Sequence, residues 1–91
     1  MRQNPKRKEV TFTFMYVPGK EVFVAGSFNK WDPKAIQLVD HDRSGSYTVT
    51  ILLPKGRHEF KFFADENWQV DPFNSESVVN EYGSLNNVIV V

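Results

Sequence analysis

The chain has 91 residues, of which 41% are hydrophobic and 14% aromatic, and its Lys and Arg residues equal its Asp and Glu residues in number. This length and composition indicate one folded domain. The chain has no cysteine, which excludes disulfide bonds, thiol nucleophiles and cysteine-ligated zinc. It is also compatible with the reducing cytoplasm, where we expect the protein to act. No apolar stretch approaches the roughly 20 residues that span a bilayer, and no apolar segment follows the basic N-terminus, so neither a membrane partner nor a secretory signal is expected.

Positive charge is concentrated at the N-terminus. Four of the eleven Lys and Arg residues lie within residues 1–8, namely Arg2, Lys6, Arg7 and Lys8. Residues 9–91 therefore contain seven Lys and Arg residues and eleven Asp and Glu residues. We interpret residues 1–8 as a basic tail, either a solvated end or the stub of a linker, and residues 9–91 as the domain. The acidic balance of the domain argues against nucleic acid as a partner.

Short segments rich in β-branched and aromatic residues alternate with turn residues along the chain. Seven strands are predicted, at residues 9–16, 21–25, 35–39, 47–53, 57–64, 68–70 and 87–91. Residues 71–83 are predicted to form a long polar loop, a kind of segment that is often functional. The regular spacing of short strands, with no convincing helix, predicts an all-β antiparallel sandwich.

The strand predicted at residues 57–64 yields a geometric expectation. Side chains alternate across a strand, so Phe60 and Phe62 point to one face and Lys61 points to the other. If the two phenylalanines belong to the core, Lys61 stands on the outer face of its sheet. Trp68 follows only a turn later, so it is expected to lie near Lys61. The alternative for Lys61 is a solvated surface charge without a ligand.

Both tryptophans, Trp31 and Trp68, stand among polar, turn-like residues instead of in apolar strand runs. A large ring held at a surface turn covers the C–H face of a sugar while nearby amide and ammonium groups bind its hydroxyls. The alternative is that both rings lie in the core, because tryptophan is highly buried on average. Asn86 and Asn87 also have two interpretations: one carboxamide points outward and binds hydroxyls, or both serve turn chemistry before the last strand.

Several segments taken together make the chain similar to a known family. They are residues 22–31 (VFVAGSFNKW), residues 53–65 (LPKGRHEFKFFAD), Trp68, Asp71-Pro72 and residues 83–87 (GSLNN). The set resembles carbohydrate-binding module family 48, and in particular the glycogen-binding domains of AMP-activated protein kinase β subunits, over about residues 10–91. The resemblance implies an immunoglobulin-like, early-set sandwich of about seven strands. It also implies a non-catalytic module that binds α-1,4-linked glucans such as glycogen, starch and maltooligosaccharides.

The resemblance implies carbohydrate-binding roles for six residues, Trp31, Lys61, Trp68, Tyr82, Ser84 and Asn86. The two tryptophans match rings that stack on glucose units, Lys61 matches a lysine that contacts hydroxyls, and Asn86 matches an asparagine that binds the sugar. Ser84 stands where the family has a threonine and keeps the hydroxyl. Tyr82 departs from the pattern, because it offers a broad ring and a hydroxyl where the family has a leucine that enters the curved glucan.

The residues argue against catalysis and against a metal site. The two histidines, His41 and His58, are far apart in the sequence, and no Ser-His-Asp set is evident. The adjacent carboxylates of Asp65 and Glu66 lie in a predicted turn and do not flank a cleft as a glycosidase pair does. We therefore expect no enzyme activity, no cofactor and no metal. The second interpretation is a β-sandwich that docks on a kinase or on an amylase-type catalytic domain or subunit, with a vestigial sugar site.

Overall fold

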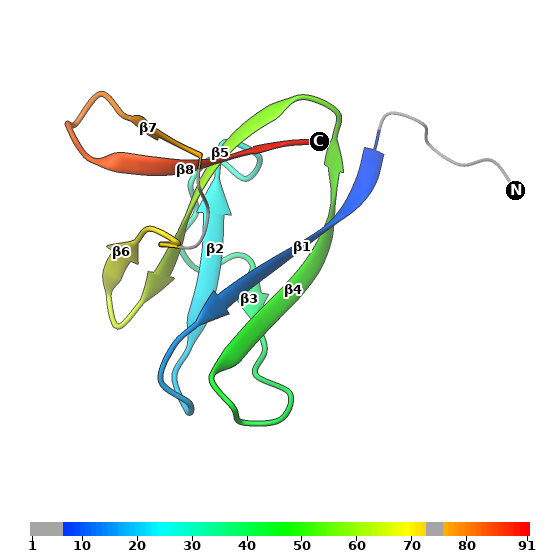
Figure 1. Ribbon diagram of the computed structural model, residues 1–91, viewed down its shortest axis with the longest axis vertical. Helices are drawn as coiled ribbons and strands as arrows, with labels where there is room; N and C mark the ends of the chain where they lie inside the picture. Colours follow the sequence, from blue (N-terminus) through cyan, green and yellow to red (C-terminus); the bar gives the residue numbers. More distant parts are fainter. Residues whose placement is uncertain (1–6, 73–75) are drawn as a thin grey trace, which may run out of the picture.

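The computed structural model describes residues 7–72 and 76–91, and this part of the chain forms two antiparallel β-sheets (Figure 1). The strands are β1 (Arg7–Met15), β2 (Val22–Gly26), β3 (Gln37–Leu38), β4 (Ser46–Pro54), β5 (Arg57–Ala64), β6 (Asn67–Gln69), β7 (Ser77–Val79) and β8 (Leu85–Val90). One sheet pairs β1 with β4, and the other has the order β3-β2-β5-β8-β7, with β6 added to β5. The all-β, immunoglobulin-like sandwich predicted from the sequence is confirmed. None of the described segments is a helix long and apolar enough to cross a membrane.

An aromatic core lies between the two sheets, because alternate residues of each strand face inward. On β1, Phe12 and Phe14 are buried while their neighbours are exposed. They meet Phe60 and Phe62 of β5, with ring centroids 4.8 Å apart for Phe12–Phe60 and 4.5 Å apart for Phe14–Phe62. Edge-to-face and offset-stacked rings of this kind add to the stabilisation by apolar burial. The prediction that Phe60 and Phe62 point inward is confirmed.

Strand β5 changes its partner along one side, and the change occurs at Lys61. Residues 57–60 pair with β8, whereas residues 62–64 pair with β6. On its other side β5 pairs continuously with β2, where Lys61 lies opposite Ala25. The two hairpins β5–β6 and β7–β8 diverge from β5 (Figure 1), and Lys61 is the residue between the two pairings.

The structure corrects the prediction for residues 71–83, because β7 lies within the segment expected to be only a polar loop. β7 pairs with β8 from Ser77 opposite Asn87 to Val79 opposite Leu85. Only Val78 of its three residues is partly buried, so the segment lacks the run of alternating residues by which a strand is recognised. β7 is thus a strand because of its hydrogen-bonded pairing with β8. Strand β8 itself begins at Leu85, two residues earlier than predicted.

The N-terminal boundary also differs in detail from the expectation. β1 begins at Arg7, two residues before the predicted strand, and pairs there with Pro54. The rest of the tail predicted at residues 1–8 lies outside the described residues. The division between tail and domain at residue 8 stays a prediction.

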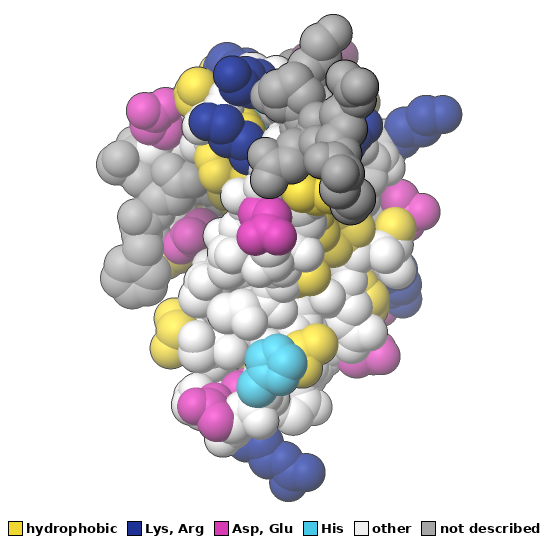
Figure 2. All heavy atoms as spheres, turned by 90° about the vertical axis from the view of Figure 1, so that its right-hand side faces the viewer, with side chains coloured by type: hydrophobic (Ala, Val, Ile, Leu, Met, Phe, Trp, Pro, Cys, Tyr) yellow, Lys and Arg dark blue, Asp and Glu magenta, His cyan; other side chains and the backbone are white. Residues whose placement is uncertain are grey.

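The outer face of the β1–β4 sheet is mostly polar and uncharged at its centre. Thr11 and Thr13 of β1 alternate with the inward-facing phenylalanines and lie opposite Thr50 and Thr48 of β4. The hydroxyls of Thr11 and Thr50 are 2.8 Å apart and share a hydrogen bond. Figure 2 views the molecule from the side on which these strands lie, and the charged side chains coloured there, of both signs, lie mainly around a white central area.

Candidate functional site

A groove opens where the hairpins β5–β6 and β7–β8 diverge. Its volume is about 810 Å³. The residues that line it are Ser27, Trp31, Glu59, Lys61, Trp68, Val79, Asn80, Glu81, Tyr82, Ser84 and Asn86. All six residues singled out in the sequence are among them. The structure therefore brings together side chains from the β2–β3 connection, β5, β6, the β7–β8 turn and β8.

The β5–β6 hairpin presents Trp68 to the groove. Its two turn residues, Asp65 and Glu66, have φ angles of 52° and 61°, as a two-residue type I′ turn requires. Trp68 pairs with Phe63 across the hairpin, and their ring centroids are 5.0 Å apart at an interplanar angle of 61°. Phe63 is nearly buried, whereas 43% of Trp68 is exposed. Trp68 thus rests on a fixed ring and keeps a free surface.

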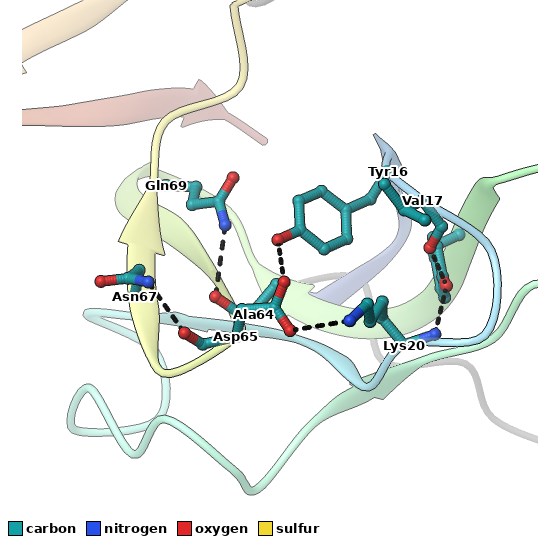
Figure 3. A network of polar contacts seen from close by, with 8 residues as sticks. Tyr16, Val17, Lys20, Ala64, Asp65, Asn67 and Gln69 are labelled. Atoms are coloured by element: carbon teal, nitrogen blue, oxygen red, sulfur yellow. Dashed lines mark hydrogen bonds and ion pairs between the residues drawn. The ribbon is translucent and has the colours of Figure 1, made fainter.

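The turn of this hairpin is held to the rest of the molecule by Asp65 (Figure 3). Its carboxylate accepts a hydrogen bond of 2.5 Å from the hydroxyl of Tyr16, which follows β1 in the opposite sheet. It also lies 3.6 Å from Nζ of Lys20. Within the hairpin, the side chain of Asn67 donates to the carbonyl of Asp65, and that of Gln69 donates to the carbonyl of Ala64. These contacts fix the direction in which the hairpin carries Trp68.

Trp31 reaches the groove from a tight turn that follows β2. The backbone of Trp31 and its neighbour Lys30 has φ angles of 58° and 57°, a conformation that costs roughly 1–2 kcal/mol per residue for a side chain other than glycine. Asn29 holds this turn, because its Oδ1 accepts the N–H of Gly26 at 2.9 Å. The N–H groups of Asn29 and Trp31 in turn donate to the carbonyl of Gly26 at 3.1 and 3.0 Å. Strained backbone that is held by such contacts is often found at functional sites.

The two tryptophans form one angular surface. Their ring centroids are 6.1 Å apart, and the ring planes meet at 74°. Neither ring belongs to the buried core cluster, so the interpretation of both as core residues is wrong. Two rings at a steep angle offer a ligand two apolar faces that point in different directions.

Lys61 lies at the floor of the groove, on the face opposite Phe60 and Phe62, as the alternation predicted. It is only 9% exposed, so it is not the fully solvated charge of the alternative interpretation. Its ammonium donates a hydrogen bond of 3.0 Å to Oγ of Ser84. An ammonium has three donors, and among the described residues only Ser84 accepts a hydrogen bond from Lys61. Trp68 lines the same groove, which confirms the expected proximity of the two residues.

The β7–β8 hairpin supplies the other wall. Tyr82 is 86% exposed at its turn, whereas Asn86 is 5% exposed and lines the groove. Asn87 is fully buried, where its Oδ1 accepts the N–H of Asp71 at 2.7 Å and its amide donates back to the carbonyl of Asp71. Of the two asparagines, Asn86 therefore lines the groove, although it is itself largely buried, whereas Asn87 is not among the groove residues.

Glu59 and Asn80 are groove residues that sequence reasoning missed. Glu59 accepts hydrogen bonds from Nδ2 of Asn86 at 2.9 Å and from Nη1 of Arg57 at 2.8 Å, and these bonds lower the pKa of its carboxyl. Alternation would have placed Glu59 on the face of Lys61, two residues away on the same strand. Asn80 lies in a segment predicted to be loop, and without the strand β7 nothing in the sequence places it beside Ser84.

The groove offers aromatic faces and hydrogen-bond donors and acceptors, but no cluster of metal ligands is present among the described residues. Similar sandwiches occur in solved structures. They include the enterobactin esterase FES from Shigella flexneri, with a TM-score of 0.78 and 18% identity over 100% of this chain and 31% of that chain. They also include the maltogenic amylase from S. marinus, with a TM-score of 0.74 and 25% identity over 93% of this chain and 14% of that chain. The fold is thus one that occurs as a module within longer chains.

Residues 8–91 match the family described as the glycogen recognition site of AMP-activated protein kinase, and the chain belongs to this family. Among its relatives is subunit beta-2 of the 5'-AMP-activated protein kinase of Mus musculus, which is 43% identical over 74 residues. Subunit beta-1 of Bos taurus is 47% identical over 75 residues. Each match covers 80% of this chain but only 26% and 25% of the relative, so the chain spans about a quarter of the length of these proteins.

Proposed function

We propose that the chain is a non-catalytic module that binds α-1,4-linked glucans in the groove between the β5–β6 and β7–β8 hairpins. The observation that carries this proposal is the pair of tryptophan rings, 6.1 Å apart at 74°, which line the same groove as Lys61 and Asn86. Trp31 and Trp68 stack on successive glucose units, while Lys61, Ser84 and Asn86 bind hydroxyls. Tyr82, at the rim, adds a contact for which its exposed ring is available. The membership of a family described by glycogen recognition supports this assignment.

The expected affinity is modest. Each stacked ring contributes about 1–2 kcal/mol and each hydrogen bond about 1 kcal/mol net. After the costs of ordering, a total of about 4–6 kcal/mol is left, which corresponds to a Kd in the micromolar-to-millimolar range. Such a module becomes effective through many sites along a polymer or through a second domain in the same chain. We infer that it serves a longer cytoplasmic protein, with a kinase or amylase-type catalytic domain or subunit as partner.

Isothermal titration tests the proposal. The domain should bind β-cyclodextrin and maltoheptaose but not cellohexaose, whose β-1,4 linkage makes a flat chain. Trp31→Ala and Trp68→Ala should each weaken binding by about 5- to 30-fold, the effect of losing roughly 1–2 kcal/mol. Leu52→Ala, at an exposed residue of β4, should leave binding unchanged and serves as the control. Folded tryptophan variants with full affinity would refute the assignment of the groove.

A docking module without sugar binding is the second candidate, and the same experiment separates it from the first. The relatives are named as subunits of a kinase, which is compatible with docking but does not favour it over glucan binding. A wild-type domain that binds neither α-glucan at millimolar concentration would support docking alone. Product analysis after incubation with maltoheptaose tests the non-catalytic part of the proposal, because released shorter oligosaccharides would contradict it.

A further inference from the structure

The side chain of Asn80 uses all four of its hydrogen-bonding positions within the β7–β8 hairpin. Its Oδ1 accepts the backbone N–H groups of Tyr82 at 2.9 Å and Ser84 at 3.1 Å. Its Nδ2 donates to Oγ of Ser84 at 2.8 Å and to Oδ1 of Asn86 at 3.1 Å. A carboxamide has two acceptor and two donor positions. The reverse orientation would set its NH₂ group against two N–H donors, so the backbone of the turn fixes which way Asn80 points.

The orientation of Asn80 determines that of Asn86. Because Asn80 presents donors, Asn86 turns its Oδ1 toward Asn80 and its Nδ2 toward Glu59, whose carboxylate accepts it at 2.9 Å. Arg57 holds the other carboxylate oxygen of Glu59 at 2.8 Å. Contacts with the described residues thereby use one N–H and one lone pair of the Asn86 amide, which leaves one of each for a ligand. Two neighbouring sugar hydroxyls, one accepting and one donating, match such a pair.

The same chain of contacts orients the hydroxyl of Ser84. Its Oγ accepts hydrogen bonds from Nδ2 of Asn80 and from Nζ of Lys61, at 2.8 and 3.0 Å. These two bonds fill both acceptor positions of a hydroxyl. The proton of Ser84 is therefore directed away from Asn80 and Lys61, which makes Ser84 a donor toward the groove.

We propose that Asn80 is a positioning residue of the glucan site, which acts with Glu59 to fix the amide of Asn86 and the hydroxyl of Ser84 in the orientations that bind sugar. This inference rests on the proposed function and deepens it, because it assigns the donor and acceptor directions by which the groove recognises hydroxyls. Asn80 itself has no hydrogen-bonding position left for the ligand, so its effect on affinity passes through its neighbours.

Asn80→Asp tests the proposal with almost no change of shape. The carboxylate still accepts the N–H groups of Tyr82 and Ser84, but it presents an acceptor to Oγ of Ser84 and to Oδ1 of Asn86. If Asn86 turns its amide to donate to the new carboxylate, its oxygen then faces the Glu59 carboxylate. We expect β-cyclodextrin to bind about tenfold more weakly at pH 7, the effect of roughly one lost hydrogen bond. Protonation of the new carboxyl restores a donor, so the affinity should recover as the pH falls toward the ordinary aspartate pKa of about 3.9.

The pH profile distinguishes positioning from a loss of structure. Glu59, Lys61 and Glu81 are the charged residues that line the groove together with Asn80. Because they affect both proteins, the affinity of the wild type is also measured at each pH, and the ratio of the two affinities is the readout. Gln37→Glu, which adds an exposed carboxylate on β3, is the matched control and should keep the wild-type ratio throughout. An Asn80→Asp affinity equal to wild type at pH 7, or a deficit that stays constant on acidification, would overturn the proposal.

A second variant keeps the proposal testable if Asn80→Asp does not fold. Glu59→Met keeps the length of the side chain but removes the acceptor of Asn86, and it should weaken β-cyclodextrin binding about threefold or more. In ¹⁵N-edited NMR spectra the side-chain NH₂ signals of Asn86 should shift in this variant. Unchanged affinity and unchanged Asn86 signals would overturn the positioning role. A wild-type domain that binds no α-glucan would instead refute the proposed function, so the two failures are distinguishable.

Discussion

Gly26 is the position where one added methyl group should damage both the core and the groove. A Cβ there would lie 2.3 Å from the carbonyl oxygen of Glu59 and 2.6 Å from Cε2 of Phe28. The carbonyl belongs to the neighbouring strand β5 and cannot turn aside, so β2 and β5 must separate. The N–H groups of Asn29 and Trp31 both donate to the carbonyl of Gly26, and a shift of β2 therefore moves Trp31.

We expect Gly26→Ala to lower the free energy of unfolding by about 2–3 kcal/mol, in the range of overpacked core variants. For a domain of this size the melting temperature falls by roughly 4–8 °C for each kcal/mol. Affinity for β-cyclodextrin should fall about tenfold, comparable to the loss of one stacking ring. Urea unfolding and isothermal titration measure the two effects.

Gly19→Ala is the matched control, because it separates close approach from backbone strain. Gly19 has a φ of 84° but nothing within 4 Å of an added Cβ, so the substitution should cost only about 1 kcal/mol of strain. It lies in the β1–β2 turn, outside the groove lining, and should leave glucan affinity unchanged. The reasoning from the close approach is wrong if Gly26→Ala has the same urea midpoint as the wild type. It is also wrong if Gly26→Ala lowers the free energy of unfolding no more than Gly19→Ala does.

Three further predictions concern stability and are measured by urea unfolding. Glu66→Gly should raise the free energy of unfolding by about 0.5–1 kcal/mol, because it relieves a left-handed φ of 61°; an equal or lower midpoint contradicts this. Tyr16→Phe should cost about 1 kcal/mol through the lost bond to Asp65, and an unchanged midpoint means that this bond contributes nothing. Hydrogen bonds from Asn86 and Arg57 lower the pKa of Glu59 in the folded state below its ordinary value of 4.5. The stabilisation of the folded state by the Glu59 carboxylate is therefore fully present above pH 4.5 and is lost as the pH falls through the lower folded-state pKa. Glu59→Gln should accordingly flatten the acid decline in stability, and an identical decline contradicts the assignment.

The fold was predictable because the long strands carry their own signal. Alternation in β5 separates Phe60 and Phe62 from Lys61, and the core cluster contains both phenylalanines but not Lys61. On β1 the same alternation buries Phe12 and Phe14 between exposed neighbours. β7 gave no such signal, because it is short and only Val78 of its three residues is partly buried, whereas its place in the sheet comes from pairing with β8. A short strand that forms only by pairing with another strand has no recognisable pattern in its own sequence.

The candidate site was predictable as a set of residues but not as a network. The tryptophans stood out because large rings among polar turn residues are unusual, and alternation placed Lys61 on their side. The role of Asn80 depends on the turn that brings residue 80 against residue 84, with a backbone hydrogen bond of 2.7 Å from its N–H to the carbonyl of Ser84. Such a contact is set by the backbone conformation of the turn, so residue types alone do not reveal it. Whether the six residues bind glucan stays a prediction that titration will test.

The change of partner along β5 explains why the groove lies at Lys61. Side chains project from the face of a sheet, so a single partner that continued along β5 would place its own side chains directly beside Lys61. Here the pairing of β8 with β5 ends at Phe60 and the pairing of β6 with β5 starts at Phe62. Each hairpin is held by its own contacts, β5–β6 through Asp65 and β7–β8 through Asn80. Variants at Asp65 should therefore displace mainly Trp68, and variants at Asn80 mainly the hydroxyl-binding groups, so the aromatic and polar halves of recognition are separable by mutation.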